Sequence, residues 1–211
     1  MRRDLTSGSL LIAGSAAGVV VMALHPTAHG LMNPETGTHL RLVNAMVHGL
    51  ALAATPLVFL GLLGLRRRLE SSAPATAAVV IYGWGCVALM SAAVASGFVA
   101  PAVIERVGAI DASTAADALL RYTGLWNQGF AKVNVVASSI GIVLFSVSIL
   151  RSRRLSPAAG VFGAVVGVAI VVLLLSGHLT LDVHGFGVVT FAQSAWLIWV
   201  GVLLCGGETA A

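Results

Sequence analysis

Long apolar stretches separated by short polar ones dominate the chain. Each stretch is near or above the roughly 20 residues that an α-helix needs to cross the hydrocarbon core of a membrane. The stretches are continuous, whereas the strands of a membrane β-barrel would alternate apolar and polar positions over short segments. We therefore expect an all-α integral membrane bundle of six transmembrane helices that forms a single transmembrane domain over residues 1–211. The expected spans are Ser9–Ala28, Val43–Leu65, Ala75–Pro101, Gly129–Leu150, Pro157–Leu181 and His184–Gly206.

Composition supports the membrane class. Apolar residues make up 58% of the chain and charged residues only 9%, against about 25% charged residues in a typical soluble domain. This balance excludes a soluble enzyme, a disordered chain and a nucleic-acid binder, and it makes the lipid bilayer the expected surroundings. Whether the chain forms a homo-oligomer or joins a larger membrane complex stays open. In general pattern the chain resembles uncharacterised bacterial six-span integral membrane proteins, and that resemblance implies a topology and no activity.

Arginine clusters predict which way the spans face. Arg2–Arg3 precede the first span, Arg66–Arg68 follow the second and Arg151–Arg154 follow the fourth. With six spans these clusters share one side, which the positive-inside rule assigns to the cytoplasm. We therefore expect a multi-pass protein of the bacterial inner membrane with both termini cytoplasmic. The first apolar stretch also has features of a signal peptide, but it is long enough to span, and we expect it to remain as a helix.

The longest loop on the predicted outer side is Ala102–Gln128. Asp111 and Ser113 are residue types that often begin a helix. We expect a short helix lying on the membrane surface here, with Leu125 directed to lipid and Trp126 at the interface.

Histidine placement is the most informative feature for function. All six histidines fall on the predicted outer side, and four of them come from different spans at nearly the same depth. Ionisable side chains in a membrane tend to face the bundle interior and find partners there, and imidazole is the commonest metal ligand. The six are His25, His29, His39, His48, His178 and His184.

The local spacings fit a set of metal ligands at the outer, periplasmic face. His25 and His29 are four residues apart, and Asp182 stands one helical turn after His178, where it could bind a metal or orient a ligating histidine. Met22 lies one turn before His25, and histidine with methionine is a ligand combination that copper favours. The candidate metal ligands are His25, His29, His48, His178, Asp182 and His184.

The sequence therefore predicts a membrane protein that binds a transition metal, with copper, zinc and iron left open. Its role would be that of a membrane metalloenzyme, in redox chemistry or metal-assisted hydrolysis. One alternative is an electron-transfer protein that holds a single b-type haem between two of the imidazoles. A second alternative is a non-enzymatic carrier or accessory subunit whose histidine cluster relays protons.

Overall fold

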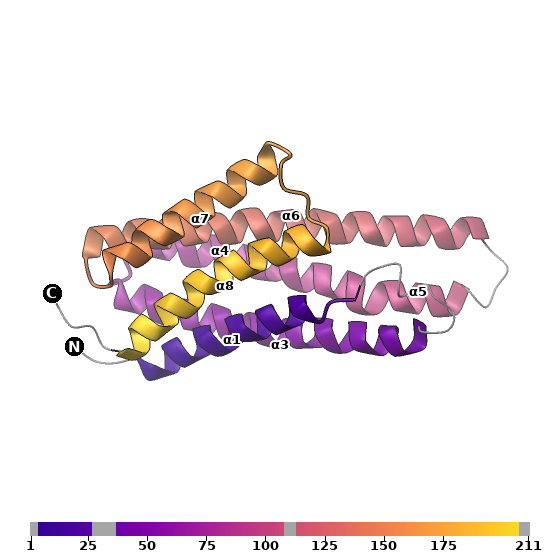
Figure 1. The fold of residues 1–211 in the computed structure, drawn as a ribbon, viewed down its shortest axis with the longest axis horizontal. Helices are drawn as coiled ribbons and strands as arrows, with labels where there is room; N and C mark the ends of the chain where they lie inside the picture. The colour runs from indigo at the N-terminus through magenta and orange to yellow at the C-terminus, as the bar shows by residue number, and fades with distance from the viewer. Residues whose placement is uncertain (1–3, 27–36, 108–112, 207–211) are drawn as a thin grey trace.

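The computed structural model describes residues 4–26, 37–107 and 113–206, and these residues form helices and no strand (Figure 1). Within them, six helical spans are long and apolar enough to cross a membrane, with α4, η1 and α5 running on as one span. The expected set of six apolar helices is therefore present. The helices are α1 (Leu5–Ala23), α3 (Gly37–Arg68), α4 (Ala73–Val94), the π-helical η1 (Ala95–Val99), α5 (Ala100–Val107), α6 (Ser113–Ser152), α7 (Pro157–Leu175) and α8 (Val183–Gly206).

The spans pack in a ring. Around it, α1 contacts α3, α3 contacts α4, α4 contacts α6, α6 contacts α7, α7 contacts α8, and α8 returns to α1. Glycines bring the backbones of α1 and its neighbours close together: a Cβ on Gly14 would meet Val58 of α3, and one on Gly201 of α8 would meet the Gly8 carbonyl. Such close packing through small residues is how membrane helices associate in lipid.

α1 begins and α8 ends at the same end of the bundle (Figure 1), where the Asp4 N–H donates to the Leu204 carbonyl at 3.1 Å. We call this the terminal end and the opposite one the distal end. A large apolar core fills the terminal half, with Leu11, Leu62, Phe145 and Trp196 all fully buried. The bundle is therefore sealed at the terminal end.

α6 begins much earlier than expected. It runs unbroken for 40 residues from Ser113, which is about 60 Å at 1.5 Å per residue. The expectation of a separate helix lying on the membrane surface is therefore wrong, because Leu125 and Trp126 belong to the extension of a span. At the distal end α3, α5 and α6 extend past the ends of α1 and α8 (Figure 1).

α1 ends earlier than expected, at Ala23 rather than Ala28. Pro26 explains the difference, because a proline disfavours helical geometry in the residue before it. His25 therefore lies beyond the end of the helix and not one turn inside it.

α7 ends at Leu175 rather than Leu181. Gly177 follows with a φ of 78°, a left-handed conformation in which glycine commonly ends a helix. His178 consequently lies outside the span, in the connection to α8.

Candidate functional site

A cavity of about 370 Å³ opens between the helices at the distal end, and we call it the distal chamber. Segments from α1, α3, α4, η1, α6 and the start of α8 contribute to its wall. The polar or ionisable residues that line it are His25, Asn44, His48, Ser96, Asn127, Gln128 and Asp182.

His25 and His48 contact each other in this chamber. Their ring centroids are 4.9 Å apart and the rings meet edge to face at 68°. His48 is only 6% exposed, and His25 is half-buried. Two of the imidazoles expected to converge are therefore brought together, from the end of α1 and from α3.

Hydrogen bonds fix the tautomer of both rings. His48 Nδ1 lies 2.8 Å from the Asn44 carbonyl, one turn earlier in α3, and His25 Nδ1 lies 2.9 Å from the Pro26 carbonyl. Because a carbonyl only accepts, each Nδ1 carries the hydrogen and each neutral ring keeps its lone pair on Nε2. Burial lowers the pKa of His25 below its ordinary value, and its bond to Pro26 offsets this only in part. The neutral form of His25 is thereby favoured.

The π-helical segment η1 shapes the wall behind His48. The Ala100 N–H bonds to the Ala95 carbonyl, five residues earlier, so the helix widens at this point. Gly97 lies against His48: a Cβ there would come within 2.7 Å of the His48 ring. A single π turn of this kind is frequent at functional sites, and here it allows α3 and the third span to approach closely.

Three amide side chains in the chamber all donate to main-chain carbonyls. Asn44 donates to Ser96 at 3.0 Å, Asn127 to Ala92 at 3.0 Å and Gln128 to Leu181 at 3.1 Å. Their amide oxygens remain as acceptors. Asn44 is 1% exposed, and its Oδ1 has no hydrogen-bond partner.

Asp182 is engaged at the start of α8. The Gly185 N–H donates to its carboxylate at 2.8 Å and Thr180 donates at 3.3 Å. The bond from Gly185 is the main cause of the lowered pKa of this carboxyl. No lysine or arginine is among the described residues that line the chamber. With this carboxylate engaged at the start of α8, the chamber presents imidazole nitrogen and amide oxygen lone pairs, which suit a cation.

Of the remaining candidate histidine ligands, the two that the structure describes do not join the pair. His178 is exposed and bonds to the Ser176 hydroxyl at 2.9 Å, and His184 is exposed at the start of α8. His39 is exposed in the first turns of α3, and His29 lies outside the described residues. Over residues 4–26, 37–107 and 113–206, no group of three or more His, Cys, Asp or Glu side chains is placed to hold a metal ion. The expected convergence of at least three of the four imidazoles is therefore not found there.

A second cavity, of about 110 Å³, continues from the distal chamber toward the terminal end. The wall of this inner cavity includes Ser15, Cys86, Asn134 and Gln193. Gln193 lines this cavity and donates to Ser138 and Ser139 of α6 at 2.9 and 3.0 Å.

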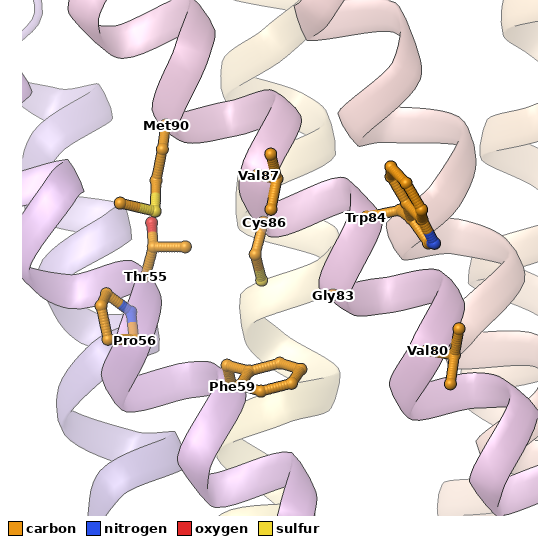
Figure 2. A pocket seen from close by; sticks show the side chains of 9 residues that line it. All are labelled: Thr55, Pro56, Phe59, Val80, Gly83, Trp84, Cys86, Val87 and Met90. Carbon is orange, nitrogen blue, oxygen red and sulfur yellow. The ribbon is translucent and has the colours of Figure 1, made fainter.

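A third hollow, of about 450 Å³, is a lateral groove between α3 and α4 (Figure 2). Phe59, Trp84 and Met90 border it, and no ionisable side chain other than the Cys86 thiol does so. Trp84 is 68% exposed. In a membrane this groove faces hydrocarbon, so the polar chemistry lies in the distal chamber and the inner cavity. Thr55 and Cys86 line both the groove and the inner cavity.

Sequence reasoning missed two contributors to these cavities. Ser15 gives no signal within the first span, since serine is common at small-residue helix contacts. Ser96 contributes a carbonyl, and no side-chain pattern reports a π turn. Comparison with known proteins adds no constraint, because no family model, curated protein or solved structure matches this chain.

Proposed function

We propose that this chain is a multi-pass inner-membrane protein that binds a transition-metal cation in the distal chamber through His25 and His48. The arginine clusters support cytoplasmic termini, which would direct the chamber to the periplasm. The observation that carries the proposal is the pair of contacting imidazoles, each of which donates Nδ1–H to a carbonyl. Metal-ligating histidines almost always donate their other ring N–H in this way.

The rest of the chamber supports a cation. The lone pairs on the two imidazoles and on the unpartnered Asn44 oxygen meet no basic side chain among the described lining residues. Leaving a buried acceptor unpaired costs free energy, and a bound cation with its water shell would recover it.

Two protein imidazoles suit exchange of the metal better than permanent retention. Structural zinc sites use four protein ligands and catalytic zinc sites use three, whereas two imidazoles leave several coordination positions open. Met22 lines the chamber beside His25 and can supply a third ligand. We therefore propose reversible cation binding as the role of the site, in preference to hydrolysis at a resident metal.

The arrangement does not fit haem. Two axial ligands of one haem lie on opposite faces of the macrocycle, whereas the rings of His25 and His48 contact each other directly. A macrocycle could enter only if the two helix segments separated, so we derive no electron-transfer role from this pair.

The test is metal binding by the purified full-length protein. Equilibrium dialysis against Cu(I), under reductant, and against Zn(II) should give about one tightly held ion per chain. His25→Ala and His48→Ala should each weaken Zn(II) binding by more than the roughly 10–100-fold that follows loss of a partner to a metal ligand. His39→Ala and His184→Ala are the matched controls and should bind as the unaltered protein does. Failure of the unaltered protein to retain either metal would overturn the proposal and leave proton relay as the better reading of the pair.

A further inference from the structure

We infer, on the basis of the proposed function, that the cation is Cu(I) and that it passes from His25 and His48 through Met22 to Cys86 in the inner cavity.

The distal chamber and the inner cavity share part of their walls. Both are bounded by one set of five residues from α1, α3, α4 and α8: Val21, Met22, Ala51, Leu89 and Phe186. From this shared zone the inner cavity extends one to two turns further along α1, past Gly18 to Ser15. A ligand in the chamber therefore has a route along the axis of the bundle.

Soft ligands occur one after another along this route. The imidazoles stand in the chamber, the Met22 thioether borders both cavities, and the Cys86 thiol is free, buried and part of the inner wall. Thiolate and thioether ligands select Cu(I) over harder divalent cations. Met46, the methionine nearest His48 in sequence, is 66% exposed and lies outside both cavities.

A second observation points to a polar occupant of the inner cavity. Ser15 is 2% exposed, lines the cavity and has no hydrogen-bond partner for its hydroxyl. Buried hydroxyls are normally satisfied, and water that accompanies a cation would satisfy this one. Asn134 and Gln193, whose amide groups donate to helices α4 and α6, line the same cavity.

The route stops at Cys86. Val58 and Leu197 line the inner cavity on its terminal side and belong to the apolar core that seals that end. Cu(I) would therefore be held at Cys86 and not released across the bundle in this conformation. Binding at Cys86 replaces the thiol proton with Cu(I), and the imidazoles freed of copper are bases that can take that proton.

The test is copper X-ray absorption on the purified full-length protein loaded with one equivalent of Cu(I) under reductant. We expect thiolate sulfur in the first coordination shell, and we expect Cys86→Ala and Cys86→Ser to remove the thiolate and leave copper on the imidazoles and the Met22 thioether. Cys205→Ala is the matched control and should leave the spectrum unchanged. Retained Zn(II) binding by the Cys86 variants would show that they still fold.

The role of Met22 is tested by kinetics. After mixing with Cu(I), Met22→Leu should slow the appearance of Cu(I)–thiolate absorption by roughly tenfold or more, as a lost intermediate ligand raises the barrier, while Met46→Leu should not. A copper shell without thiolate sulfur, a Cu(I)–thiolate absorption that survives in Cys86→Ala, or an unslowed Met22→Leu would each overturn this inference and leave metal binding at the imidazoles intact. If the unaltered protein retains no metal, the proposed function fails, and this inference fails with it.

Discussion

At the scale of single residues, hydrogen-bond partners distinguish among the histidines that the sequence predicted to form one site. His25 and His48 each have one ring nitrogen committed to a carbonyl inside a buried chamber. Nδ1 of His178 instead hydrogen-bonds to the exposed hydroxyl of Ser176. A buried imidazole with a fixed tautomer is prepared for ligation, whereas an exposed one is free to turn. Asp182 is also engaged, because its carboxylate accepts the Gly185 N–H at the start of α8.

Asp182→Ala should therefore lower stability while leaving metal affinity unchanged. The carboxylate accepts the Gly185 N–H at the first turn of α8, and replacing such a cap by Ala costs about 0.5–2 kcal/mol. Asp182→Asn retains an acceptor and should lose only a small part of this. Thermal unfolding in detergent measures the first quantity and metal titration the second. A large loss of affinity in Asp182→Asn would return this residue to the list of ligands.

At the scale of elements, the chamber depends on irregular helix segments. A regular helix through residues 95–99 would not present the same turn to α3, where Gly97 meets His48. The ends of α1 and α7 matter equally, because each releases a histidine from its helix. His25, beyond the end of α1, lies within the bundle. His178, beyond the end of α7, lies on the surface and bonds to Ser176.

Gly97→Ala should lower both stability and metal affinity. The added methyl group would press on the His48 ring and push η1 away from α3, and overpacking of this kind costs about 1–3 kcal/mol.

The control for Gly97→Ala is Gly49→Ala. Gly49 neighbours His48 in α3, and a Cβ there meets nothing within 4 Å. This substitution should stabilise the helix by about 0.5–1 kcal/mol without altering affinity. Equal effects of the two substitutions, measured by thermal unfolding and metal titration, would show that the π turn does not shape the site.

At the scale of the whole molecule, the bundle has two unlike ends. The terminal half is an apolar core, and the distal half holds the polar chamber and the inner cavity below it. Arg66, Arg67 and Arg68 close α3 at the terminal end, where Arg154 also pairs with Glu70. The positive-inside rule would place these arginines in the cytoplasm and therefore the chamber on the periplasmic side.

Cysteine labelling tests that orientation. In a background of Cys86→Ala and Cys205→Ala, an impermeant maleimide should label Glu105→Cys on intact cells and should label Glu70→Cys only after the membrane is opened. Both positions are exposed in the structure, so accessibility within the protein does not limit either reaction. The reverse pattern would place the chamber in the cytoplasm and would remove the proposed periplasmic source of the metal.

The sequence alone determined the six apolar spans, their helical type and the end of the bundle at which the described histidines lie. These follow from a strong local constraint: a segment in lipid must satisfy its backbone internally and must be apolar along its whole length. Only the tertiary structure decided which histidines meet. His25 joins His48 because α1 stops before Pro26 and because Gly97 lets the third span approach α3. His178 is excluded because the chain turns at Gly177. Such convergence depends on where helices end and which neighbours they pack against, and hydropathy along a chain does not encode either one.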